Sequence, residues 1–264
     1  MRKSGLLLLI FVLLLSQFGG LPAYAATETE GDFEYRDSDN GDGTVIITDY
    51  KGLGGDIVIP AQLGGKPVTE IDRTAFQEKE LTKVKIPGSV KSIGVAAFAK
   101  NSELRSVTIE NGVTLIGASA FTDGKLEEVT IPSSVTSIGK AAFYHNELRS
   151  VTIQSGVKSI DEGAFQYNKL EKVTIPSSVT SIGYFVFRGN PLKIVKFVGV
   201  PTGDVSSSFH IDGPDFKGWF EDAGFTKPVP GIVSTQIIYA DWNNWHRRYC
   251  KEGILAGFIA NEGD

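Results

Sequence analysis

Few side chains in this sequence have the types and spacing that catalysis needs. The 264 residues contain three histidines, His145, His210 and His246, and a single cysteine, Cys250. No two histidines have the helical spacing of a metal-binding pair, and the sequence lacks a Gly-x-Ser-x-Gly nucleophile elbow and a glycine-rich phosphate loop. His246 precedes Cys250 by four residues, but one such pair in an unpatterned segment is a weak sign of a nucleophile.

Paired carboxylates offer no better catalytic site. Glu127 and Glu128 are adjacent, and adjacent side chains of a strand point to opposite faces, so they cannot act as an acid/base pair. The sequence therefore predicts a protein that is not an enzyme and that has no catalytic residues, metal or cofactor.

The acidic stretch "DSDNGDGT", residues 37–44, has the composition of a calcium loop. A loop of the EF-hand kind needs oxygen ligands at positions 1, 3, 5 and 12, with glycine at position 6. An alignment that starts at Ser38 matches the middle of this pattern, but it places serine first and Asp49 last, where glutamate is usual. An Asn/Asp/Gly-rich turn between two strands explains the stretch better.

The N-terminus has the features of a secretory signal peptide. Arg2 and Lys3 precede the apolar run Leu6–Leu15, and an Ala-x-Ala exit follows at Ala23 and Ala25. The run is too short for a membrane-spanning helix. We therefore predict that residues 1–25 are a signal peptide cleaved near Ala25, and that the protein is secreted or displayed at the cell surface.

The net charge limits the kinds of molecule that the protein is expected to bind. The formal charge of −5 becomes −7 once Arg2 and Lys3 are removed with the signal peptide. A mildly acidic protein has no general electrostatic attraction for nucleic acids or anionic membranes, so we expect neither nucleic-acid binding nor membrane insertion. Cys250 cannot form an internal disulfide, so packing or a bound metal must stabilise the exported chain.

A repeat of 22 or 23 residues dominates the middle of the chain. Phenylalanines recur at this spacing: Phe76, Phe98, Phe121, Phe143, Phe165 and Phe187. Each is followed by a leucine and an apolar pair, which is Val-x-Ile in five repeats, as in Leu126, Val129 and Ile131, and Val195-x-Phe197 in the last. In those five repeats a second apolar pair follows, as in Val135 and Ile138. Val-x-Ile places both side chains on one face of a short strand. Turns that favour a positive φ are expected at four glycines: Gly94, Gly117, Gly139 and Gly183.

Each repeat reads as one coil of a solenoid. Burying its apolar side chains yields roughly 10 kcal/mol, whereas ordering 22 backbone units costs about 20–40 kcal/mol before hydrogen bonds are counted. One coil therefore needs neighbours. We predict a repeat solenoid, a leucine-rich-repeat rod in which coils stacked about 4.8 Å apart share one parallel β-sheet.

The repeats alternate in kind. The phrase "VTIPSSVTSIG" occurs at residues 129–139 and again at 173–183, whereas a looser relative lies between the two copies. Coils that begin "LRSVTI" alternate with coils that begin "LEEVTI" or "LEKVTI". The copied unit is therefore predicted to be a block of two coils.

The pattern "L-x-x-V-x-I-P-x-x-V-x-x-I-G-x-x-A-F" resembles the BspA-like (treponemal-type) leucine-rich repeat. The segment before it, with "DGTVIITDY" and "GKPVTEI", resembles the N-terminal cap of the same family. The resemblance covers roughly residues 33–200 and implies a surface or secreted role in protein interaction or adhesion. We assign residues 26–72 to the cap and 73–198 to the repeats.

Composition shifts after Val198. "FKGWFEDAGFTKPV" and "IIYADW" resemble the second half of an internalin-type B (Listeria–Bacteroides) repeat. Residues 199–242 are expected to form either part of such a module or a small β cap on the solenoid, and residues 243–264 match no pattern. Trp219 and Trp242 are candidate sugar contacts, with core packing as the alternative.

Two columns of exposed side chains are expected along the rod. The first alternates in sign: Arg105, Glu127, Arg149, Glu171 and Lys193. Opposite charges on adjacent strands attract, so this column is either a self-neutralising ladder or a mixed-charge strip that docks a protein. The second column consists of threonines: Thr108, Thr130, Thr152 and Thr174. Threonine suits an exposed strand position, and a single column lacks the flat Thr-x-Thr array of an ice-binding surface.

Together these features predict an exported, monomeric, non-enzymatic binding protein. Its solenoid is expected to contact a protein or glycan ligand outside the cell. The alternative is a structural or targeting module that binds carbohydrate through its C-terminal aromatic residues.

Overall fold

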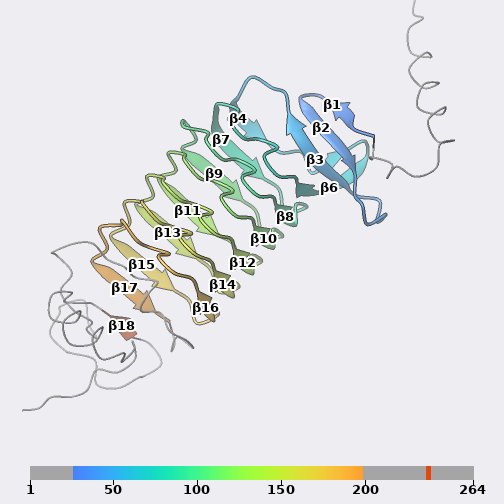
Figure 1. The fold of residues 1–264 in the computed structure, drawn as a ribbon. Helices are drawn as coiled ribbons and strands as arrows, with labels where there is room; N and C mark the ends of the chain where they lie inside the picture. The colour runs from blue at the N-terminus through green and yellow to red at the C-terminus, as the bar shows by residue number, and fades with distance from the viewer. Residues whose placement is uncertain (1–25, 199–235, 239–264) are drawn as a thin grey trace, which may run out of the picture.

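The computed structural model describes residues 26–198 and 236–238. Over this part of the chain, β-strands and turns wind into a rod without a helix (Figure 1). One side of the rod carries the longer strands: β7 (Leu81–Ile86), β9 (Ser106–Ile109), β11 (Glu128–Ile131), β13 (Ser150–Ile153), β15 (Lys172–Ile175) and β17 (Ile194–Phe197). Another carries two-residue strands: β8 (Ser92–Ile93), β10 (Leu115–Ile116), β12 (Ser137–Ile138), β14 (Ser159–Ile160) and β16 (Ser181–Ile182).

Strand register confirms the predicted solenoid. Equivalent residues of successive coils lie opposite one another in parallel ladders, as Val129 and Val151 do in β11 and β13. The expectation of one parallel sheet was incomplete, because the short strands form a second one, in which Ile138 of β12 lies between its equivalents in β10 and β14. The second apolar pair of each repeat therefore supplies both a buried isoleucine and a ladder position.

The six repeat phenylalanines form a continuous stack in the core. Each has at most 1% of its surface exposed, and neighbouring ring centroids lie 4.9–5.6 Å apart with interplanar angles of 2–16°. This spacing is close to that of adjacent strands, so one ring fits each coil. Because every coil depends on the rings above and below, the stack makes the coils mutually supporting.

The N-terminal segment covers one end of this stack. It comprises β1 (Glu28–Glu30), β2 (Phe33–Asp37), β3 (Val45–Tyr50), β4 (Gly55–Val58), β5 (Gln62–Leu63) and β6 (Lys66–Ile71). β1, β2 and β3 are antiparallel, whereas β3 and β6 continue the short-strand sheet and β4 continues the long-strand side. Tyr50 stacks on Phe76 at 5.4 Å, and Phe33 lies 5.4 Å from Tyr50, so aromatic rings close the core.

The acidic stretch of residues 37–44 is the turn between β2 and β3. The Ser38 N–H donates to the Thr44 carbonyl at 2.9 Å. One carboxylate oxygen of Asp42 accepts from both the N–H and the hydroxyl of Thr44, at 3.1 and 2.6 Å, and these bonds lower the pKa of Asp42. The carboxylate therefore holds the turn closed, as the Asn/Asp/Gly composition predicts.

The repeat glycines have a different role from the one predicted. Gly94, Gly117, Gly139 and Gly183 do not have a positive φ. A Cβ at Gly139 would lie 2.7 Å from the Ala118 nitrogen, and one at Gly94 would lie 2.6 Å from the Ile71 oxygen. These glycines are needed because the backbones of successive coils approach too closely for a side chain.

Left-handed backbone occurs instead on either side of each phenylalanine, mostly without glycine. The positions two residues before the rings include Ala96 and Ala141, at φ 54°, and the positions two residues after them include Lys100 and His145. Their N–H groups donate to carbonyls of the next coil, as Ala141 does to Glu162 at 2.8 Å. These inter-coil bonds offset the cost of about 1 kcal/mol or more per left-handed residue.

The long-strand side is paired two coils at a time. β7 with β9, β11 with β13 and β15 with β17 form ladders, whereas no ladder joins the described strands β9 and β11, or β13 and β15, which nevertheless touch. Within a pair, the Gln154 N–H donates to the Ile131 carbonyl at 3.1 Å. Pro132 and Pro176 occupy the equivalent position at the interrupted steps and have no N–H to donate. The interruption recurs with the two-coil period of the sequence.

The far end is described only in part. β18 (Gln236–Ile238) pairs antiparallel with β17, with Ile238 opposite Val195. The predicted signal peptide, the rest of 199–242 with Trp219 and Trp242, and residues 243–264 lie outside the described residues. So do His210, His246 and Cys250.

Candidate binding surfaces

The described residues hold one histidine, His145, in a loop between coils. Its Nδ1 lies 2.7 Å from Asp123 Oδ1, and its side chain is 67% exposed. Within residues 26–198 and 236–238, no three His, Cys, Asp or Glu side chains gather closely enough to hold a metal ion. The same residues include no helix long and apolar enough to cross a membrane.

The predicted threonine column lies on the outer face of the long strands. Thr130 is opposite Thr152 in the β11–β13 ladder, Thr108 is opposite Lys85, and Thr174 is opposite Lys196. Thr108, Thr130 and Thr152 are exposed and Thr174 is half buried. The column is therefore a continuous, solvent-facing line. We call it, with the charged column described next, the strand face.

The predicted charged column lies three residues before the threonines in each coil, with a further column of polar residues between the two: Ser106, Glu128, Ser150 and Lys172. The Arg149 N–H donates to the Glu127 carbonyl at 2.8 Å, and the Lys193 N–H donates to the Glu171 carbonyl at 2.8 Å, which places the residues on successive coils. Glu171 and Lys193 form an ion pair of 3.0 Å. Arg105 lies 4.0 Å from Glu127 and 3.1 Å from Glu103.

A second column of alternating charge, which the sequence analysis missed, lies two residues before the first. Its members are Glu103, Lys125, Glu147 and Lys169. Lys125 pairs with Glu103, and Lys169 pairs with Glu147 at 2.8 Å; the hydrogen bonds lower the pKa values of Glu103 and Glu147. The signal was present in the sequence, because each repeat leucine from Leu104 to Leu170 is flanked by two charges of opposite sign.

The two columns form a checkerboard of charge. Signs alternate from coil to coil within each column and across the leucine between them. Within the described residues, Arg149 is the one member of the two columns that makes no ion pair, and its side chain is exposed. A checkerboard has little net potential at a distance, so the strand face is suited to contact by shape and hydrogen bonding rather than to long-range attraction.

A buried row of asparagines lies beneath the loops that follow each phenylalanine. Its members are Asn101, Asn146, Asn168 and Asn190, all at most 6% exposed. The Asn168 side chain accepts from the Leu148 N–H at 3.1 Å and donates to the Phe143 carbonyl at 2.8 Å, in the preceding coil. Each asparagine thus satisfies backbone groups that would otherwise be buried without partners.

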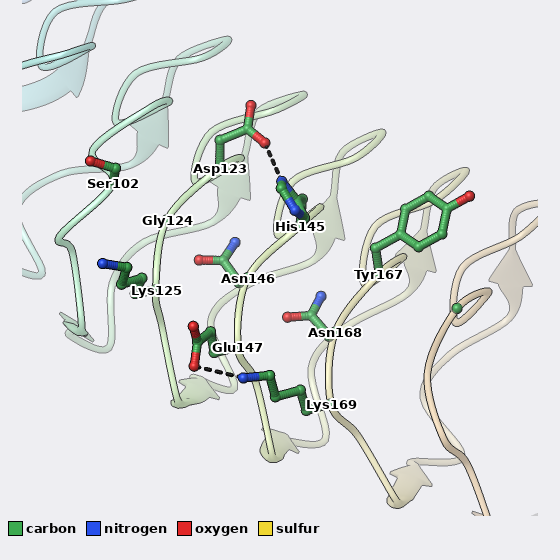
Figure 2. Close-up of a pocket in the computed structure, with 11 residues that line it drawn as sticks. Ser102, Asp123, Gly124, Lys125, His145, Asn146, Glu147, Tyr167, Asn168 and Lys169 are labelled. Atoms are coloured by element: carbon green, nitrogen blue, oxygen red, sulfur yellow. Dashed lines mark hydrogen bonds and ion pairs between the residues drawn. The ribbon is translucent and has the colours of Figure 1, made fainter.

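Gly124 interrupts this row. The loop of the preceding coil, residues 99–103, carries the one extra residue of the repeat, and the Leu104 N–H bonds to the Asn101 carbonyl within that loop at 2.9 Å. An asparagine at position 124 is therefore unnecessary. Gly124 is one of the residues that line a groove of about 680 Å³, which runs over the loops from Ser102 to Gly189 (Figure 2). We call it the loop groove.

Comparison with known proteins identifies the repeat. Residues 69–193 match the BspA type leucine rich repeat region in six copies. No curated protein matches the chain. The match confirms the predicted repeat type over this part of the chain; the internalin-type B repeat predicted in the C-terminal segment is not shown.

Solved structures resemble the chain over about two thirds of its length. A leucine rich cell surface protein from Faecalibacterium prausnitzii is 30% identical, with a TM-score of 0.48, over 65% of this chain and 54% of its own. The pneumococcal vaccine antigen PcpA is 24% identical, with a TM-score of 0.55, over 66% and 50%. The leucine rich repeat protein TpLRR of T. pallidum is 30% identical, with a TM-score of 0.46, over 61% and 88%. The chain spans about half the length of the first two.

Proposed function

We propose that this chain, whose residues 69–193 are a BspA-type leucine-rich-repeat region, is a non-enzymatic binding protein that docks a protein partner outside the bacterial cell. The observation that carries the proposal is the strand face. It is a rigid, exposed sheet surface on which three threonines follow one another at solvent-exposed positions. The predicted signal peptide supports secretion or display at the cell surface.

The rigidity of the rod favours this use. The side chains of the strand face are attached to strands whose inner residues, such as Val129 and Ile131, are at most 4% exposed. Their positions are therefore fixed before a partner arrives, and little conformational entropy is lost on binding. Threonine hydroxyls supply donors and acceptors without charge, and every member of the charged column except Arg149 is ion-paired. We therefore expect binding that changes little between low and high salt.

Binding assays with the mature chain, residues 26–264, test the proposal. The probes are a panel of purified extracellular-matrix proteins and intact cells, with binding measured by surface plasmon resonance and flow cytometry. The double variant Thr130→Arg, Thr152→Arg places two long charged side chains at the centre of the strand face and is expected to weaken binding about tenfold or more. Thr114→Arg, Thr136→Arg is the matched control, because these exposed threonines lie beside the short strands.

The outcomes separate clearly. Loss of binding in the strand-face variant with retention in the control supports the proposal. Equal loss in both variants, equal retention in both, or no binding by the unaltered chain would reject it. Binding that disappears on addition of salt would indicate that electrostatic attraction, and not shape and hydrogen bonding, holds the partner.

A further inference from the structure

The loop groove differs from the strand face in its composition. One of its walls is a row of side chains that leave the same left-handed corner in three successive coils, Asp123, His145 and Tyr167, with φ of 53–57°. Its floor is the interrupted asparagine row, in which Asn146 and Asn168 follow Gly124. Figure 2 shows His145 beside Asp123, with Tyr167 next along the row. The groove is therefore bounded by fixed side chains on parallel coils.

Tyr167 forms a platform at one end of this groove. The residue is 42% exposed, yet its ring is held, because the edge of Tyr144 meets it at 5.5 Å and 89°. The ring also packs against Gly189, where a Cβ would collide with it. Its equivalents in the two preceding coils are His145 and Asp123. Among these corner positions, an exposed aromatic ring therefore occurs where the next coil has glycine.

Hydrogen-bonding groups surround the platform, and their charges are balanced. His145 Nδ1 is bonded to the Asp123 carboxylate at 2.7 Å; since a carboxylate only accepts, Nδ1 donates and Nε2 is left for another partner. On the opposite wall, Glu147 pairs with Lys169, and Lys125 pairs with Glu103 outside the groove. A charged ligand would have to compete with these pairs. A neutral ligand can donate to the carboxylates and accept from the ammonium groups without separating them.

We propose that the loop groove is a binding site for a neutral saccharide. A pyranose ring has a C–H face that stacks on an aromatic ring, and hydroxyls that both donate and accept hydrogen bonds, which is what Tyr167 and the surrounding pairs offer. The groove volume of about 680 Å³ lies within the usual range of about 300–1,000 Å³ for small-molecule sites. Lys125, Glu147 and Lys169 of its wall belong to the second charged column, which adjoins the strand face, whereas Tyr167 belongs to neither charged column.

Isothermal titration calorimetry of the mature chain, residues 26–264, tests this site. The probes are short linear oligosaccharides of glucose, mannose and N-acetylglucosamine, with a sulfated heparin fragment as the anionic comparison. Tyr167→Ala is expected to weaken binding of the neutral oligosaccharide about tenfold. Tyr167→Phe keeps the ring and is expected to stay within about threefold of the unaltered protein. Tyr184→Ala is the matched control, because Tyr184 is 62% exposed and lies outside the groove.

Each outcome decides the proposal. Neutral-oligosaccharide binding that falls in Tyr167→Ala and persists in Tyr167→Phe and Tyr184→Ala supports it. The proposal is overturned if no neutral oligosaccharide binds, if only the heparin fragment binds, or if Tyr167→Ala binds as the unaltered chain does. Tyr167→Ala also removes the packing of the ring against Tyr144 and Gly189, so its circular dichroism spectrum and thermal midpoint are measured alongside, which keeps loss of binding distinct from loss of folding.

Discussion

The strand side and the loop side of the same coils follow the repeat to different degrees. On the strand side, the threonines recur in four successive coils and the charges alternate without a break from Glu103 to Lys193. On the loop side, an extra residue, the missing asparagine at Gly124 and the exposed ring of Tyr167 fall within four successive coils. Residues that follow the repeat form the strand face, and residues that depart from the repeat line the loop groove. Both depend on an interior that does not vary.

A substitution in the interior is expected to have the largest effect on stability. Phe143→Ala removes a ring with no exposed surface from between two stacked neighbours and leaves a cavity, so the free energy of unfolding is expected to fall by about 3–5 kcal/mol. Urea titration followed by circular dichroism measures it. Thr130→Ala, on the strand face, is the control and should change stability by no more than about 0.5 kcal/mol. Similar losses in both variants would contradict the division between interior and surface.

A substitution in the asparagine row is expected to have the next largest effect on stability. Asn168→Ala leaves the Leu148 N–H and the Phe143 carbonyl without their partner, both buried, and is expected to cost about 2–3 kcal/mol. The neighbouring variant Tyr167→Ala should cost less, because the partly exposed ring loses packing but leaves no buried backbone group without a partner. If Asn168→Ala were as stable as Tyr167→Ala in the same urea titration, the row would not support the loops.

Two glycine variants sharpen the corrected role of the turn glycines. Gly139→Ala places a Cβ 2.7 Å from the backbone of the preceding coil and is expected to cost about 1–3 kcal/mol, although its φ is not positive. Gly163→Ala, at φ +63°, meets only the end of the Gln166 side chain and occupies a column that already holds Ala96 and Ala141. It should cost about 1 kcal/mol or less. The reverse order, measured by thermal melting, would show that backbone conformation outweighs coil spacing.

The smallest effect should come from the surface ions. The Lys169 and Lys125 hydrogen bonds lower the pKa values of Glu147 and Glu103 in the folded chain. A carboxylate with a lowered folded pKa stabilises the protein above its unfolded pKa of about 4.3, and that contribution is lost as the pH falls through the folded pKa. Stability should therefore decline below about pH 4–5, and the decline should be shallower in Lys169→Met than in the unaltered chain. An equal slope in both proteins would contradict the pairing.

The sequence determined the positions that repeat. The 22-residue spacing of the phenylalanines and the Val-x-Ile pairs predicted the coils, the inward residues and the threonine column, because a parallel stack places equivalent residues opposite one another. The two-coil block in the sequence predicted that the structure repeats every second coil, but it did not show which structural feature has that period. At the interrupted steps Pro132 and Pro176 lack the N–H that Gln154 donates, but Pro87 occupies the same position at the β4–β7 step, where the ladder continues, so the prolines alone do not account for the interruption.

The rest depends on distances between coils, which a single repeat does not encode. Gly139 looked like a turn residue because glycine often has a positive φ, but the near contact with Ala118 explains it. The buried asparagines recur in the sequence, but the sequence does not show that their side chains form hydrogen bonds with the preceding coil. Gly124 replaces asparagine in one coil and lines the loop groove, and only the stacking of the coils shows which residues line the groove with it. The role of Tyr167 also depends on stacking, because its ring lines the groove and packs against Gly189 of the next coil.

The most direct test measures both ligands on both surfaces in one experiment. The strand-face variant Thr130→Arg, Thr152→Arg and the groove variant Tyr167→Ala are each titrated with the protein partner and with the neutral oligosaccharide that the unaltered chain binds. The account predicts that each variant loses about tenfold in affinity for its own ligand and stays within about twofold for the other. If one variant weakened both ligands equally, or if each weakened the other's ligand, the separation of the two surfaces would be contradicted.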